Sequence, residues 1–89
     1  MTWTIRFTPE ADKSFSKLDK AIQRRIVKKL RDVCSSGNPT ASGKALTGDF
    51  VGFWRYRVGD YCLVCSIEND ELIVLVVDID HRSTVYKTQ

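Results

Sequence analysis

Residues 53–61 read FWRYRVGDY. Bulky apolar residues alternate with arginines until the run ends at a Gly-Asp pair. Because successive side chains of a β-strand point to opposite faces, the alternation predicts a strand with Trp54 and Tyr56 on a buried face. Arg55 and Arg57 then share the other face, and the Gly-Asp pair predicts a tight hairpin turn.

Two more strand signals accompany this one at close spacing. We expect strands at about 50–58, 61–68 and 71–79, because these runs are rich in β-branched and aromatic residues. The pairs Gly59-Asp60 and Asn69-Asp70 suit tight turns between the three strands. This half of the chain therefore predicts two consecutive hairpins.

The N-terminal half predicts one strand and two helices. Residues 2–7 alternate with period two, and Thr8-Pro9 is typical of a helix start, because a hydroxyl can cap the first turn and proline is tolerated there. Residues 35–43 are rich in turn formers and predict a loop. Between them, apolar residues recur at helical spacing on either side of a possible break at Asp19, namely Ala11, Phe15, Leu18, Ile22, Ile26, Leu30 and Val33.

The predicted element order is β-α-α-β-β-β, which is an α+β fold. Residues 72–77 are apolar on both faces, so this strand should be central in the sheet. We expect a small, mainly antiparallel sheet with the two N-terminal helices packed on one face. A chain of 89 residues can build one modest core, so residues 1–89 are predicted to form a single domain.

Charge is segregated along the chain. Residues 13–31 hold eight lysines and arginines against one aspartate, whereas residues 60–80 hold six acidic residues and no basic one. The outer face of the second predicted helix is almost entirely basic. An ordinary solvated helix face is one interpretation, and contact with nucleic-acid phosphate is the other. The candidate RNA- or ribosome-binding residues on this face are Arg24, Arg25, Lys28, Lys29 and Arg31.

The sequence does not resemble a membrane or secreted protein. No run approaches the roughly 18 to 20 apolar residues that cross a bilayer. The N-terminus MTWTIRFTPE lacks the basic start and apolar middle of a signal peptide. We therefore expect a cytoplasmic protein with no membrane partner.

The three cysteines are expected to be reduced, since their number is odd and no secretory signal accompanies them. Cys62 and Cys65 match a CxxC pattern, but on a strand their odd spacing sends the two side chains to opposite faces. They are predicted to be buried structural thiols. With His81 as the one histidine, the chain offers too few nitrogen and sulfur ligands for a zinc site, so we expect no metal and no cofactor.

Arg55 and Arg57 could form an anion clamp, because two residues of strand rise place their Cα atoms roughly 7 Å apart, close to the spacing of successive phosphates. The alternative is that both arginines coat a solvent-facing sheet and pair with nearby acids. The C-terminal run from His81 to Lys87 adds Arg82 and Tyr86 near the rim of the sheet. Cations that hold phosphate and a ring that stacks on a base together favour RNA recognition.

The chain resembles the RelE/ParE toxin superfamily, and its RelE branch in particular. The resemblance rests on the element order, on residues 44–48 (KALTG), on residues 54–61 (WRYRVGDY) and on the ending 81–86 (HRSTVY), and it covers essentially the whole chain. RelE-type toxins cleave messenger RNA in the ribosomal A site. The resemblance implies a metal-free attack of the ribose 2′-hydroxyl on its own phosphate, which leaves a 2′,3′-cyclic phosphate.

The resemblance also implies roles for individual residues. Arg55 and Arg57 match basic positions that contact the scissile phosphate, Arg82 matches an arginine that stabilises the transition state or protonates the leaving group, and Tyr86 matches a tyrosine that stacks on an mRNA base. Lys44 is a further candidate for RNA contact. Arginine is a poor proton acceptor near pH 7, so His81 is a candidate acid or base.

Departures from the family pattern concern the same site. Many RelE-type toxins carry lysine at the positions of Arg55 and Arg57, and Cys62 stands where a further family arginine is expected. The identity of the proton acceptor is therefore left open by the sequence.

The resemblance implies three kinds of partner: a cognate antitoxin protein, the ribosome with its mRNA, and operator DNA that is contacted only through the antitoxin complex. Two other functions stay open. One is a ParE-like inhibitor of DNA gyrase, which would act through a protein interface. The other is a non-catalytic module that binds ribosome or RNA and blocks translation without cutting.

Overall fold

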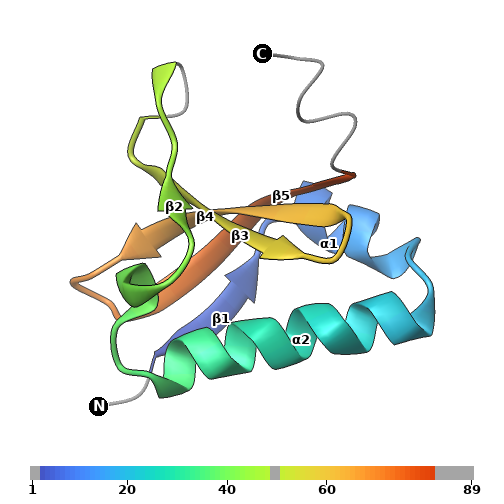
Figure 1. Cartoon of the computed structure of the whole chain (residues 1–89), viewed down its shortest axis with the longest axis horizontal. Coiled ribbons are helices and arrows are strands. Elements are labelled where there is room, and N and C mark those ends of the chain that lie inside the picture. Colours follow the sequence, from blue (N-terminus) through green and yellow to red (C-terminus); the bar gives the residue numbers. More distant parts are fainter. Residues whose placement is uncertain (1–2, 49–50, 82–89) are drawn as a thin grey trace.

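The computed structural model describes residues 3–48 and 51–81. They form two helices beneath one five-stranded sheet, and the second helix runs along the underside of the sheet (Figure 1). The elements in chain order are β1 (Thr4–Phe7), α1 (Pro9–Ser16), α2 (Lys20–Ser35), the 3-10 helix η1 (Pro39–Ala41), β2 (Lys44–Ala45), β3 (Phe53–Val58), β4 (Tyr61–Glu68) and β5 (Ile73–His81).

The strands lie in the order β1-β5-β4-β3-β2. β1 runs parallel to β5, and the other three neighbouring pairs are antiparallel. The α+β fold class and the mainly antiparallel sheet predicted from the sequence are confirmed. β5 lies inside the sheet between β1 and β4, but the central strand is β4 rather than β5 as the sequence predicted.

One strand was missing from the predicted order, and two predicted strands begin later than expected. The missing strand is β2, which pairs with β3. β3 begins at Phe53 rather than near residue 50, because residues 51–52 form a turn and Gly52 has a φ of 96°. β5 begins at Ile73, so residues 69–72 make a four-residue connection instead of a tight Asn-Asp turn, and Leu72 takes a φ of 57°. The Gly59-Asp60 turn between β3 and β4 is confirmed.

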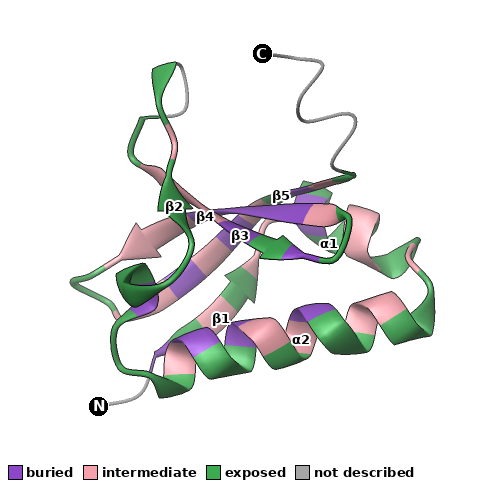
Figure 2. Cartoon of the chain, viewed as in Figure 1, coloured by how far each residue is buried: buried purple, intermediate pink, exposed green. Residues whose placement is uncertain are grey.

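The core lies between the sheet and α2. Ile26 and Leu30 of α2 are fully buried against strand residues such as Tyr56 and Leu63, and these residues belong to one apolar cluster. The purple segments of Figure 2 accordingly lie on the strands and on the side of α2 that faces them. Each fully buried Val, Leu or Ile side chain of this cluster stabilises the fold by about 1.5–3 kcal/mol relative to exposure.

The CxxC prediction is confirmed. Cys62 pairs across the sheet with Arg57, whereas Cys65 pairs with Trp54 and joins the core cluster, so the two thiols occupy opposite faces. Cys34, Cys62 and Cys65 are free cysteines, and burial raises the pKa of the Cys65 thiol to about 12. A thiol with such a pKa stays protonated at neutral pH, which is typical of a structural cysteine.

Thr8 caps α1 as the sequence predicted. Its Oγ1 accepts a hydrogen bond of 3.2 Å from the backbone N–H of Ala11, and the same hydroxyl donates to the Val77 carbonyl at 3.4 Å. We expect Thr8→Ala to lower the free energy of unfolding by about 1 kcal/mol. Urea denaturation measures this, with the exposed Thr47→Ala as the control. Equal stability of the two variants would show that the cap is unimportant.

Candidate nucleic-acid interface

Three predicted site residues meet on one face of the sheet. Lys44 of β2 pairs directly with Arg55 of β3, and Arg57 follows two residues along the same strand. Directly opposed side chains have Cβ atoms about 5 Å apart, so the lysine and the first arginine are close neighbours. The register therefore gathers Lys44, Arg55 and Arg57 into one group, which we call the strand cations.

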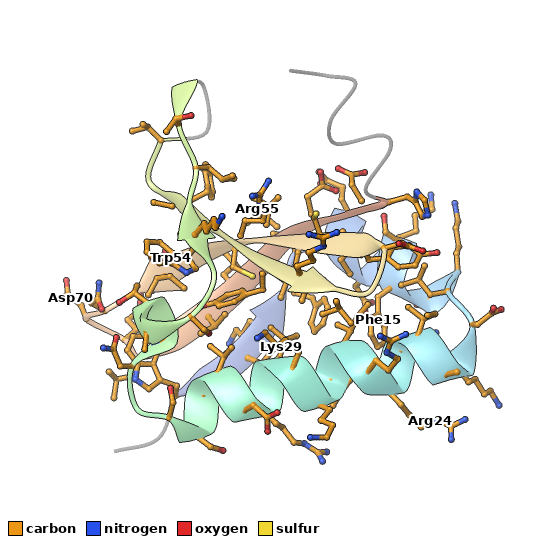
Figure 3. All side chains as sticks on the ribbon, in the orientation of Figure 1. Phe15, Arg24, Lys29, Trp54, Arg55 and Asp70 are labelled. Atoms are coloured by element: carbon orange, nitrogen blue, oxygen red, sulfur yellow. The ribbon has the colours of Figure 1, made fainter. Side chains whose placement is uncertain are left out.

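The strand cations lie on the face of the sheet away from the helices. Their neighbours Trp54, Tyr56 and Val58 point to the helix side, and Tyr56 and Val58 are buried in the core. In Figure 3, Arg55 accordingly lies on the far side of the sheet from α2. Like charges directly opposite one another destabilise a sheet, so the Lys44–Arg55 pair does not itself stabilise the pairing of β2 with β3.

A second group of cations meets Arg57 at the end of the hairpin. A pocket of about 280 Å³ is lined by Arg25, Lys28 and Lys29 of α2, by Arg57 of β3, and by the turn residue Gly59. Asp32 also lines it, but its carboxylate forms an ion pair of 3.5 Å with Lys28. The pocket is thus strongly cationic, and Arg57 belongs both to it and to the strand cations.

Sequence reasoning missed two carboxylates on the same face as the strand cations. The register places Asp78 in one row with Val64 and Arg55, and Asp80 in one row with Cys62 and Arg57. A β-bulge at Val77 causes this arrangement. Val64 pairs with Asp78 and Cys65 with Val76, so Val77 has no register partner in β4. Without the bulge, the alternation of Val74 and Val76 would carry both aspartates to the helix side.

The two aspartates share a proton-binding site. A hydrogen bond with Asp78, followed by partial burial and the nearby Asp78 charge, raises the pKa of Asp80 to about 6. Asp80 therefore changes its charge close to neutral pH. This is a typical property of groups that transfer protons in active sites.

This pKa predicts a pH-dependent stability. A folded-state value near 6, above the ordinary value of 3.8, means that Asp80 stabilises the fold below pH 4 and that this contribution is lost as the pH rises to 6. We expect Asp80→Asn to gain thermal stability relative to the unchanged protein between pH 4 and pH 7. Asp78→Ala, which removes the hydrogen bond, should shrink that pH dependence. A difference in melting temperature between Asp80→Asn and the unchanged protein that stays the same at every pH would contradict the raised pKa of Asp80.

The other predicted site residues are placed differently. His81 ends β5 opposite Tyr61, on the helix side of the sheet by register, and its ring meets the tyrosine ring edge-on at 5.3 Å. Cys62, which stands in place of an expected arginine, is 1% exposed. Arg82 and Tyr86 lie outside the described residues, so their predicted roles stay predictions.

The remaining predicted helix cations face elsewhere. Arg24 and Arg31 line a larger groove of about 640 Å³ with the apolar side chains of Phe15 and Val27. Lys28 lies between the two regions and lines both. The α2 residues proposed as one basic face are therefore divided between two sides of the helix.

The described residues can be compared with the requirements of a metal site and of a membrane-spanning helix. Among residues 3–48 and 51–81, no three His, Cys, Asp or Glu side chains gather as metal ligands would. Within the same ranges, no helix combines the length and the apolar character needed to cross a membrane.

A small α+β domain with a cationic sheet face and a cationic helix is suited to a polyanionic ligand. Comparison with known proteins defines the class further. A family model described as the ParE toxin of type II toxin–antitoxin systems matches residues 5–86. The chain therefore belongs to the RelE/ParE toxin family and is the toxin of a type II toxin–antitoxin system, as the sequence resemblance implied.

Individual relatives agree with the family. The chain is 31% identical over 88 residues to toxin RelG of Mycobacterium tuberculosis, covering 98% of this chain and 99% of the relative. It is 32% identical over 89 residues to a putative RelE-like toxin of Escherichia coli, covering 97% and 92% respectively. Its fold superimposes with a TM-score of 0.81 on a chain of the RelBE2 toxin–antitoxin complex from M. tuberculosis, at 29% identity and with 92% and 100% of the chains covered.

Proposed function

We propose that this toxin is a ribosome-dependent endoribonuclease that cleaves mRNA in the A site and so inhibits translation. The observation that carries the proposal is the group of strand cations: Lys44 beside Arg55, with Arg57 two residues on. Such a group can hold a phosphodiester and neutralise the charge that develops on it in the transition state. The RelE-type names of the relatives support the same class of function.

The proposed reaction needs no metal ion. The 2′-oxygen attacks the adjacent phosphorus, the bond from phosphorus to the 5′-oxygen breaks, and a 2′,3′-cyclic phosphate remains. The 2′-hydroxyl gives its proton to a base, and the 5′-oxygen takes a proton from an acid. Arg55 and Arg57 hold the phosphate, and by family resemblance Arg82 acts at the leaving group and Tyr86 stacks on a base.

Asp80 is the proton acceptor that the proposal favours over His81. Its pKa of about 6 suits acceptance of a proton near pH 7, and it lies on the face of the strand cations. His81 lies on the helix side by register. Under this assignment Asp80→Asn removes the acidic limb of the pH profile of cleavage, and His81→Gln leaves that limb in place.

The proposal includes partners that the solved relative suggests. The similar M. tuberculosis structure is a toxin–antitoxin complex, and we infer that this toxin likewise binds a cognate antitoxin. Its action on ribosomes and mRNA takes place in the cytoplasm, and operator DNA is reached only through the antitoxin complex. Since a carboxylate such as Asp80 is only a weak base, the ribosome is needed to hold the RNA in line for attack.

Primer extension on a defined mRNA carried by programmed ribosomes tests the proposal. Cuts at A-site codons with the purified toxin, and intact RNA when ribosomes are left out, are the expected result. Intact mRNA with stalled translation would show a binder that does not cut. Vigorous cutting of naked RNA would contradict the ribosome dependence.

Inhibition of DNA gyrase is a second candidate function. The description of the matching family model as a ParE toxin favours it. A supercoiling assay with purified gyrase separates the two functions, since an mRNA endoribonuclease leaves supercoiling unchanged.

A further inference from the structure

The basic residues of α2 do not act as one surface. Arg25 and Lys29 are four residues apart and so lie on one side of the helix, next to the hairpin that carries Arg57. Arg24 and Arg31 line the groove on the other side of the helix with Phe15. Figure 3 shows this division, because Arg24 points away from the sheet while Lys29 lies between α2 and the sheet.

The β3–β4 turn is shaped around the Arg25 side chain. Gly59 has a φ of 57°, and a Cβ atom built there would lie 3.2 Å from one guanidinium nitrogen of Arg25 and 3.3 Å from the other. Contacts this short are tighter than ordinary van der Waals contact. The absence of a side chain at position 59 therefore leaves room for the guanidinium to rest against the turn, beside Arg57.

Few acids oppose the cations of this pocket. Among the described residues, the ion pair at the pocket is the one between Lys28 and Asp32, and no ion pair joins Arg25, Lys29 or Arg57 to a carboxylate. The pocket thus holds an excess of positive charge around a space of about 280 Å³.

We propose that Arg25, Lys29 and Arg57 bind a backbone phosphate of the RNA substrate, next to the phosphate held by the strand cations. This assignment rests on the proposed function, because it makes α2 contribute to the substrate site. Arg57 lies between the two phosphates, and a single RNA strand runs from the sheet face around the end of β3 to α2. Arg24 and Arg31 take no part in holding that strand.

The affinity for a short single-stranded RNA tests the assignment. A 2′-O-methylated oligonucleotide is the probe, since it lacks the attacking hydroxyl and stays intact, and fluorescence anisotropy gives its affinity over a range of salt concentrations. Each phosphate contact to a single strand contributes about 0.7 to the slope of log affinity against log salt. Because the three cations share one phosphate, we expect Arg25→Gln and Lys29→Gln each to reduce the slope, and the double substitution to reduce it by about 0.7 in total.

Arg24→Gln is the matched control, because it removes the same charge from the adjacent position of the same helix. It is expected to leave the slope unchanged. If Arg24→Gln and Arg25→Gln reduced the slope equally, or if neither reduced it, the proposed phosphate site would be contradicted. Circular dichroism of each variant checks that the substitutions leave the fold intact, since Arg24 and Arg25 are exposed and Lys29 is half-buried.

The outcome is separable from that of the proposed function. Intact mRNA on ribosomes together with a reduced slope for Arg25→Gln would refute the nuclease and keep the RNA-binding pocket. Cleaved mRNA with equal slopes for Arg24→Gln and Arg25→Gln would keep the nuclease and refute the pocket.

Discussion

The Arg55→Ala toxin is expected to cleave mRNA on ribosomes about 10²- to 10³-fold more slowly than the unchanged toxin. Arg55 lies directly opposite Lys44 and two residues from Arg57, at the centre of the strand cations. Its guanidinium supplies charge-assisted hydrogen bonds to a phosphate whose charge grows in the transition state. Losing it removes stabilisation of that state while two neighbouring cations still bind the ground state, so the rate falls more than the affinity.

Arg6→Ala is the matched control for Arg55→Ala. Arg6 is exposed on β1, and its register through Leu75, Ser66 and Phe53 places it on the same face of the sheet at the opposite edge. Both variants lose one arginine from one sheet face. Single-turnover cleavage on programmed ribosomes should therefore fall for Arg55→Ala alone. An equal fall in both would mean that the face acts through its total charge and that the strand cations hold no particular phosphate.

Most of the fold follows from local patterns. The alternation of residues 53–58 and the helical spacing of Ile22, Ile26 and Leu30 specify β3 and α2, since burying one face requires that periodicity. β2 was not predictable in this way, because two residues carry no period. Its position depends on contacts between residues distant in the sequence, such as the hydrogen bond from the Trp54 indole to the Ser42 carbonyl just before β2.

The candidate site was predictable only where it depends on local alternation. The pairing of Arg55 and Arg57 follows from strand alternation alone, whereas the place of Lys44 beside Arg55 needs the β2–β3 register. Asp78 and Asp80 could not have been found, because one bulge residue reverses the face on which both lie. The resemblance to known toxins supplied the functional class, and the register shows which described residues share a face.

A substitution at Gly43 should affect both the fold and the site. Gly43 has a φ of 75°, and a Cβ atom built there would lie 2.5 Å from the Arg55 carbonyl oxygen and 2.7 Å from Nε1 of Trp54. The segment before β2 cannot move away easily, because the Trp54 indole donates to the Ser42 carbonyl at 2.6 Å. Close approach of this segment to β3 is what sets Lys44 beside Arg55, so only glycine fits at position 43.

Gly43→Ala therefore has two destabilising effects, backbone strain and a steric clash with β3. Gly37→Ala has only the first, so the pair of variants separates the two effects. Gly37 has a nearly equal φ of 77°, but a Cβ atom there would meet nothing within 4 Å. We expect Gly37→Ala to lower the free energy of unfolding by about 1–2 kcal/mol through backbone strain alone. Gly43→Ala should cost about 1–3 kcal/mol more, because the added methyl group collides with β3.

Urea denaturation of both variants measures that difference, and cleavage on ribosomes shows its effect on the site. Under conditions where both variants are folded, Gly43→Ala should cleave more slowly than Gly37→Ala, since displacement of β2 moves Lys44 away from Arg55. Equal stabilities would mean that the segment relaxes without cost. Lower stability with unchanged cleavage would mean that Lys44 is not needed beside Arg55, and the phosphate would then be held by the two arginines of β3 alone.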